Sequence, residues 1–456
     1  MTTELKDGYF PSYTETDNKV IGILERPNWG KAVILGAQHT LAMFGGTILS
    51  PRLAGFDPNT SLFFSGVGTI LFYFVSGGRV PSFLGNSFAF IGVTHAATGY
   101  SFASTGLNPN LAVAQGGIIF SGIAYLLVGI IVVLAGHKWI EYLLPPVVTG
   151  SVIMAIGLNL STVAIDDASR SMDSPWQAAV TAIITASVTV FGRGLFGRLP
   201  VLVGLTIGFI LSIIVGKITG DITREVPLQS IADAPFFAFP TFYAPSFDLK
   251  AISLITPVAI IQVAENLGHV KAVGVIADVD LTPYLGRAFI GDALATILAG
   301  FGGGLGLTTY AENIGVMAMT NVYSTLIFVI AACFATLLGF IPKFGAIISA
   351  IPPGVIGGLS IILFGLVTAT GARIWIQNQV DFSDPVNLIT AAVAIVLGSG
   401  MKHDKPIRFG EYIQLDGLGS ATIVCILVYF FFRRIPQMIT GERDEESPLA
   451  KKDEAH

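Results

Sequence analysis

Charged residues are scarce in this sequence. Aspartate, glutamate, lysine and arginine make up 12% of the 456 residues, whereas 52% of the residues are hydrophobic. Soluble domains carry roughly 25% charged residues, about twice this share. So few charges cannot cover a water-facing surface for a chain of this length, which excludes a soluble enzyme of two or three domains. The composition instead predicts an all-α polytopic membrane protein.

Cysteines and long runs of one charge are also nearly absent. The only two cysteines, Cys333 and Cys425, lie in apolar runs, which excludes a disulfide framework and a CxxC metal site. The chain has no basic block, so nucleic acid is not an expected partner. No metal cluster or nucleophile triad is visible, and the glycines at 302–306 lack the Lys-Ser/Thr ending of a phosphate loop. We therefore expect a protein that is not an enzyme and uses no cofactor.

Apolar runs recur along the chain at about 20 residues, the length that crosses the hydrocarbon core of a bilayer. We predict fourteen transmembrane segments, at 31–50, 59–78, 83–99, 111–135, 143–163, 176–193, 199–219, 251–272, 283–304, 305–321, 322–341, 346–370, 385–400 and 414–435. The third and tenth segments are short and polar and contain glycine, so we expect them to be interrupted helices.

The distribution of lysine and arginine predicts the orientation of the chain. If both termini are cytoplasmic, that side receives 16 of the 25 lysines and arginines, as the positive-inside rule requires. Residues 1–30 and 436–456 are then cytoplasmic tails, and the first is too polar to be a cleavable signal peptide. The stretch 220–250, which we interpret as polar, becomes an extracytoplasmic loop.

The two halves of the chain resemble each other. Pro145-Pro146 and Pro352-Pro353 open the fifth and twelfth segments, and residues 88–93 of the third segment align with 311–316 of the tenth. Both matches join segment n to segment n+7. Because seven is odd, the second half must enter the membrane upside down. A 7+7 inverted repeat with interrupted helices in corresponding positions is typical of secondary transporters.

Ionisable residues inside the predicted segments need a reason, because each costs about 2.5–3.5 kcal/mol on insertion scales. Glu265 and His269 of the eighth segment lie four residues apart and therefore share a helix face. Further candidates are Glu312 and Asn313 in the tenth segment, His39 in the first and Asp292 in the ninth. Less specific roles remain open: His39 could be a packing histidine, Asp292 could tie the ninth helix to the tenth, and the two glutamates could be structural.

The interrupted helices and the glutamates together suggest a ligand. The first backbone N–H groups of a broken helix have no partner within the helix and can donate to a ligand carbonyl. Two carboxylates beside them can accept from ligand N–H groups. Such a site suits a small, flat molecule that alternates C=O and N–H, as an oxopyrimidine or oxopurine does. A carboxylate in this setting can also exchange a proton, which makes proton-coupled uptake feasible.

The same segments resemble the nucleobase–ascorbate transporter family. Residues 312–315 (ENIG), followed by Thr320, are similar to the family signature, an acidic or amide residue and then Asn-x-Gly-x4-Thr. Gln38-His39, residues 264–269 (AENLGH) and residues 85–90 (GNSFAF) are similar to the first, eighth and third segments of the family. The likeness covers nearly the whole chain from about Lys31 to Arg434. Asn321 departs from the signature, which usually ends in Arg, Lys or Gly.

The resemblance implies a division into two domains. A core domain would comprise segments 1–4 (31–136) and 8–11 (251–342), and a gate domain segments 5–7 (137–219) and 12–14 (343–435). Short strands would precede the third and tenth helices. A homodimer in the bacterial inner membrane is also implied.

The resemblance further assigns roles to residues. Glu265 and Glu312 would hold the base, and the backbone N–H groups of Phe88 and Ala311 would complete its hydrogen bonds. His269 would support Glu265 or take part in proton coupling, with His39, Asp292 and Asn313 in support. Ser360 and Phe364 would contact the substrate from the gate side.

The resulting hypothesis is a uracil:proton symporter that works by movement of the core domain against the gate domain. Glutamate rather than glutamine at the first position of the signature favours a uracil-type substrate, and the likeness within the family is to bacterial uracil permeases. The alternatives are a xanthine or urate permease of the same family and an anion exchanger of the same architecture. The expected partners are uracil, H⁺ as the coupling ion, and membrane lipid.

Overall fold

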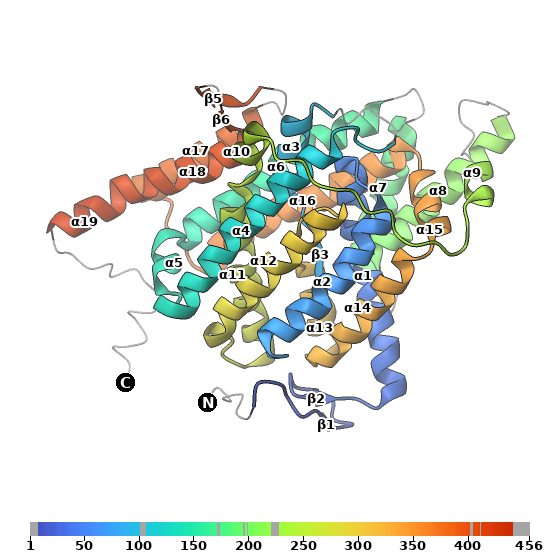
Figure 1. Ribbon diagram of the computed structural model, residues 1–456, viewed down its shortest axis with the longest axis horizontal. Helices are drawn as coiled ribbons and strands as arrows, with labels where there is room; N and C mark the ends of the chain where they lie inside the picture. The colour runs from blue at the N-terminus through green and yellow to red at the C-terminus, as the bar shows by residue number, and fades with distance from the viewer. Residues whose placement is uncertain are drawn as a thin grey trace.

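The computed structural model describes residues 8–100, 106–170, 174–194, 197, 199–219, 228–401, 405–410 and 412–440 (Figure 1). The helices are α1 Trp29–Ala54, α2 Pro58–Ser76, α3 Ala89–Thr98, α4 Leu111–Ala135, α5 Lys138–Leu143, α6 Pro146–Ser169, α7 Ser174–Phe191, α8 Pro200–Thr219, α9 Leu228–Asp233, α10 Leu249–Ile255, α11 Val258–Ala277, α12 Leu285–Gly302, α13 Ala311–Thr320, α14 Thr325–Gly339, α15 Pro342–Ser349, α16 Pro353–Gln377, α17 Pro385–Gly400, α18 Gly417–Tyr429 and α19 Ile435–Thr440. The strands are β1 Thr14–Glu15, β2 Glu25–Arg26, β3 Leu84–Asn86, β4 Leu307–Thr309, β5 Ile407–Phe409 and β6 Ile413–Leu415.

Ten helices in the described part of the chain are long and apolar enough to cross a membrane. An eleventh candidate is the pair α14 and α15, which is bent by 80°. The chain is thus mostly helical and crosses a membrane many times, as predicted. The other predicted segments coincide with α3 and α13, of ten residues each, and with α17, of 16 residues. At a rise of about 1.5 Å per residue these helices are shorter than the hydrocarbon core, so the count of fourteen spans stays a prediction.

Local sequence signals explain where the long helices begin and end. Pro146 and Pro353 occupy the first turns of α6 and α16, where the missing N–H of proline does no harm. The carboxylate of Asp57 caps α2 by accepting from Asn59 N at 3.1 Å. Gly55 and Gly77, in the left-handed conformation, end α1 and α2.

The two short strands expected before the interrupted helices are present, and they pair with each other. β3 and β4 are antiparallel, with Gly85 opposite Thr308. The bonds from Ser87 N to Gly306 O (2.9 Å) and from Tyr310 N to Phe83 O (3.1 Å) extend the pairing beyond the strands. The sequence alignment of Phe88 with Ala311 also aligns Gly85 with Thr308, so equivalent residues face each other at the centre of the pair. This is a local two-fold relation, and the repeat over the whole chain stays a prediction.

Two glycines allow aromatic rings to cover the strand pair. A Cβ atom on Gly306 would lie 2.2 Å from Cε2 of Phe90, and one on Gly85 would lie 2.3 Å from Cζ of Tyr310. The hydroxyl of Tyr310 donates to Asn86 O at 2.7 Å. The strand pair is therefore covered by aromatic residues of its own two strand–helix units.

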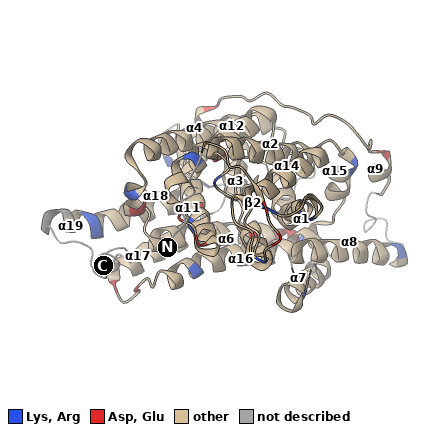
Figure 2. Ribbon diagram, turned by 90° about the horizontal axis from the view of Figure 1, so that it is seen from below, with Lys and Arg blue, Asp and Glu red and all other residues tan. Residues whose placement is uncertain are grey.

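The long helices pack as two bundles around this pair. In the first bundle α12 packs on α4 and α2, α14 packs on α2 and α1, and α11 contacts α4, β4 and α13. In the second bundle α16 packs on α6 and α7, and α17 packs on α6 and α18. Figure 2 shows α4, α12, α2 and α14 on one side and α17, α6, α16, α7 and α8 on the other. The bundles contain the segments that we assigned to the core and gate domains, and that division stays a prediction.

Two polar contacts link the bundles at opposite ends of their helices. Arg52 near the end of α1 donates to Ile351 O, two residues before α16, at 2.6 Å. Lys271 of α11 pairs with Glu141 of α5, the short helix before α6, at 2.8 Å.

The predicted N-terminal tail packs against the first bundle where the structure describes it. Ile21 is fully buried, and its backbone bonds to Asn321 O and Tyr323 N, both at 2.9 Å. Tyr9 donates to Val75 O at 2.7 Å, and the guanidinium of Arg287 lies 4.9 Å from the centre of the Tyr9 ring. Residues 8–28 thus form a docked segment on the side where α2 ends and α14 begins. Parts of three predicted regions, 1–7, 220–227 and 441–456, lie outside the described residues.

We expect Gly306→Ala to destabilise the protein, because its methyl group would overlap the ring of Phe90. Overpacking a tight site typically costs about 1–3 kcal/mol. The measurement is thermal unfolding of the purified protein in detergent. Gly400→Ala is the control, because a Cβ there meets no atom within 4 Å. Equal melting temperatures for the two variants would contradict the role given to this glycine.

Candidate functional site

The candidate site lies where the two strand–helix units meet α11. Phe88 directly precedes α3, and Ala311 is the first residue of α13. The first N–H groups of both helices point away from their helices and carry the positive end of the helix dipole. Since β3 and β4 are antiparallel, the two helices leave the strand pair at opposite ends. The fold therefore places two sets of hydrogen-bond donors beside one short sheet.

Glu265 and His269 share a face of α11, as predicted, and both reach β4. The carboxylate of Glu265 accepts from the hydroxyl of Thr308 at 3.3 Å. Nδ1 of His269 lies 2.9 Å from the hydroxyl of Thr309. Both side chains are half-buried. Consecutive threonines of one strand thus orient the two ionisable residues, and the observed partner of His269 is Thr309 rather than Glu265.

Glu312 is the second residue of α13 and is half-buried. The helix α13 that carries it contacts α11, the helix of Glu265. Ala311 beside it is exposed. A Cβ on Gly268 of α11 or on Gly315 of α13 would meet no heavy atom within 4 Å. The two carboxylates therefore stand next to open space, which a small ligand can enter.

A contact between His39 of α1 and Asn313 of α13 supports α13. Nδ1 of His39 lies 3.2 Å from Oδ1 of Asn313, and both side chains are buried. The imidazole ring packs on Phe328 with 4.7 Å between ring centres. Burial and these contacts make the pair a brace between α1 and α13 that positions the neighbouring Glu312.

Asp292 lies in a fully buried cluster behind Glu265. Its Oδ2 accepts from Asn266 Nδ2 at 3.0 Å and from the Tyr125 hydroxyl at 3.3 Å, and Asn266 also donates to Tyr125 at 2.8 Å. The cluster joins α12 to α11 and α4. The less specific interpretation of Asp292, a tie from the ninth segment to the tenth, is therefore wrong in its partner: the tie runs to the eighth and fourth segments. Because Asn266 adjoins Glu265, the cluster fixes the rotation of α11.

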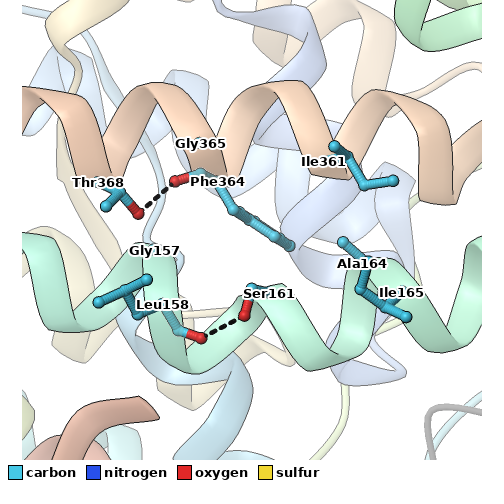
Figure 3. Close-up of a pocket in the computed structure, with 9 residues that line it drawn as sticks. All are labelled: Gly157, Leu158, Ser161, Ala164, Ile165, Ile361, Phe364, Gly365 and Thr368. Atoms are coloured by element: carbon cyan, nitrogen blue, oxygen red, sulfur yellow. Dashed lines mark hydrogen bonds between the residues drawn. The ribbon is translucent and has the colours of Figure 1, made fainter. Parts of the chain in front are cut away.

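Phe88 meets the second bundle at Phe364. Their rings are in edge-to-face contact, with 5.5 Å between centres. Phe364 also lines a cavity of about 240 Å³ between α6 and α16, and Figure 3 shows its ring lying between these helices. Ser161 and Thr368 add hydroxyl groups to the lining, but both donate within their own helices, to Leu158 O and Phe364 O. The cavity wall contains neither glutamate.

Ser360 is fully buried one turn before Phe364 and is not part of this wall. The structure thus brings Phe88 and Phe364 together and places the side chains of Glu265 and His269 against β4. Sequence reasoning missed Thr308 and Thr309, although two adjacent threonines just before the tenth helix were the available signal.

The comparison with protein families covers most of the chain. Residues 30–406 match the family model Xan_ur_permease, described as "Permease family". The chain is 50% identical over 415 residues to "Putative pyrimidine permease RutG" of Escherichia coli K12, covering 91% of this chain and 92% of that protein. It is 38% identical over 450 residues to "Uracil permease" of the same organism (95% and 98% covered) and 37% identical over 432 residues to "Uracil permease" of Bacillus caldolyticus (92% and 96% covered).

Solved structures share the fold at low sequence identity. The transmembrane domain of the cyanobacterial bicarbonate transporter BicA superposes with a TM-score of 0.62 at 15% identity, covering 90% of this chain and 99% of that one. The murine anion transporter Slc26a9 superposes with a TM-score of 0.64 at 11% identity, covering 90% and 69%. At such identities the likeness concerns the fold alone. From the family match and the near-complete relatives, the chain belongs to the nucleobase–ascorbate transporter family of membrane permeases.

Proposed function

We propose that this protein imports a nucleobase, uracil in the first instance, by proton symport. The observation that carries the proposal is the pair of half-buried carboxylates, Glu265 and Glu312, beside the N-terminal ends of two short membrane helices. The names of the relatives, uracil and pyrimidine permeases, support the same substrate class.

Uracil offers two carbonyl groups and two N–H groups around a flat ring. Glu265 and Glu312 accept from the N–H groups in this proposal, and the backbone N–H groups of Phe88 and Ala311 donate to the carbonyls. The aromatic ring of Phe88, in contact with Phe364, supplies an apolar surface for the base. Ser360 and Phe364 are the expected contributions of the second bundle.

Proton coupling is assigned to the groups around α11. Glu265 takes up the proton, and His269 holds the strand through Thr309 or relays the proton. His39, Asn313 and Asp292 support the site by fixing α13 and α11. A carboxylate that binds both a proton and the substrate couples the two. Protonation of the carboxylate changes its affinity for the substrate, and bound substrate changes its affinity for the proton by the same factor.

Alternating access is assigned to movement of the first bundle, as core, against the second, as gate. The two helix bundles and the few polar contacts between their ends, such as Arg52 with Ile351 O, support this movement. The inner-membrane location, the cytoplasmic termini, the fourteen spans and the homodimer belong to the same proposal.

We expect purified protein in proteoliposomes to accumulate labelled uracil when the outside is acidic. Accumulation should stop when a protonophore collapses the gradient. Excess unlabelled uracil should compete fully and xanthine weakly. Dominant competition by xanthine would favour the purine-permease alternative, whereas chloride- or bicarbonate-driven exchange without uracil uptake would favour the anion exchanger.

Glu265→Gln and Glu312→Gln should each reduce uracil uptake by at least tenfold. A buried polar group that loses its partner costs about 1–3 kcal/mol, or more when a charge is involved. Glu15→Gln is the control, because Glu15 lies on the docked N-terminal segment with about half of its side chain exposed. If Glu265→Gln retains uptake that still depends on the pH gradient, the coupling role of Glu265 is wrong.

Thr308→Val should raise the uracil concentration for half-maximal uptake about 2- to 10-fold. The substitution removes one hydrogen bond to Glu265 at nearly constant shape, and such a bond contributes about 0.5–1.5 kcal/mol net. Thr370→Val is the matched control, because that hydroxyl donates to Leu366 O within its own helix. Unchanged uptake kinetics in Thr308→Val would show that the strand does not orient the carboxylate.

A further inference from the structure

An aromatic segment without regular structure joins α9 to α10. It comprises residues 234–247, which we call the aromatic strap, and it holds five phenylalanines and one tyrosine but no charged residue. Asp233 and Asp248 flank it. The prediction of a polar loop at 220–250 is therefore wrong for this part. In Figure 2 the strap runs along the outer edge of the first bundle, from α9 past α15, α14, α2 and α12 toward α4.

The backbone of the strap is fastened to the ends of the first-bundle helices. Ala238 N donates to Phe340 O at 3.0 Å, and Ser246 N donates to Ala112 O at 2.8 Å. Side chains of the bundle hold it between these points: Thr60 donates to Thr241 O at 3.1 Å, and Gln115 donates to Tyr243 O at 2.8 Å. The strap is thus a fixed part of the surface.

The phenylalanine side chains nevertheless stay more than half exposed, although Phe237 and Phe239 contact Phe340 and Phe242 contacts Phe63 and Phe64. Phe236, Phe237, Phe239, Phe242 and Phe247 are 73%, 63%, 76%, 57% and 57% exposed, respectively. Their surface is continuous with that of the apolar helices: Phe247 contacts Phe120 of α4, which is itself 39% exposed, with 6.0 Å between ring centres. Water would be an unfavourable neighbour for five such rings on one short segment.

Two constraints determine what can cover this surface. Irregular backbone does not occur in contact with lipid in the hydrocarbon core, because unpaired N–H and C=O groups cost several kcal/mol there. Tyrosine and tryptophan gather instead at the boundary between hydrocarbon and head groups. Phenylalanine on the apolar face of a segment lying in this boundary inserts its ring toward the acyl chains, while the backbone can still bond to water. The strap combines exposed rings with an irregular backbone at the ends of the membrane helices.

We propose that the aromatic strap binds the bilayer interface, with its phenylalanine rings inserted at the boundary between lipid head groups and acyl chains. The partner is phospholipid, and the site is the outer edge of the first bundle. The strap would hold that bundle at a defined depth in one leaflet. This proposal does not depend on the transported substrate.

A nitroxide label attached at Phe239→Cys tests the proposal. The background carries Cys333→Ser, since Cys333 is exposed and Cys425 is buried. The full-length protein is placed in nanodiscs of phosphatidylethanolamine and phosphatidylglycerol. Collision of the label with oxygen and with a water-soluble nickel chelate then reports its depth. Ala232→Cys on α9, an exposed position just before the strap, is the matched control.

The label at 239 should collide at least several-fold more with oxygen, relative to nickel, than the label at 232. Equal ratios at the two positions would overturn the proposal, because the strap would then lie in water. Exclusion of both reagents at 239 would also overturn it, because a protein surface, such as a second copy, would then cover the strap. Phe242→Cys gives the same readout if Phe239→Cys fails to fold.

Discussion

The antiparallel pairing of β3 with β4 is the contact on which the rest of this structure depends. A chain that stops being helical inside a bilayer must satisfy its backbone groups some other way. Here each interrupted segment provides three strand residues that pair with the other segment's, and Gly85 and Gly306 let the rings of Tyr310 and Phe90 seal the pair. Two helices can therefore begin within the protein rather than at its surface.

The polar residues of the membrane region are organised around this pair in layers. Thr308 and Thr309 of β4 orient Glu265 and His269 of α11. Behind them, the buried Asp292 cluster fixes α11, and the contact of His39 with Asn313 fixes α13. Glu265 and His269 contact the strand pair directly, whereas Asp292 and His39 contact the helices behind it. Of the ionisable residues, the two glutamates next to open space are proposed to hold the substrate, and the enclosed His39 and Asp292 hold the frame.

Much of this arrangement could be predicted from the sequence, and the errors have physical causes. The long apolar helices and the shared face of Glu265 and His269 follow from composition and periodicity, and the two short strands were implied by the family resemblance. Partners across the bundle follow from neither: Asp292 reaches Asn266 and Tyr125 because α12, α4 and α11 contact one another, and periodicity does not reveal which helices pack together. The strap at 234–247 was misjudged because its phenylalanines, interrupted by proline, form no apolar run of membrane length.

The sequence by itself determined that the chain crosses a membrane, which family it belongs to and which carboxylates are out of place in hydrocarbon. These conclusions rest on the cost of burying charge and on local motifs, and both are readable in one dimension. Only the tertiary structure decided that Thr308 and Thr309 hold Glu265 and His269, that Phe88 meets Phe364, and that the N-terminal segment docks on the first bundle. These contacts join residues far apart in the chain, and their geometry comes from how helices and strands pack, which no single segment encodes.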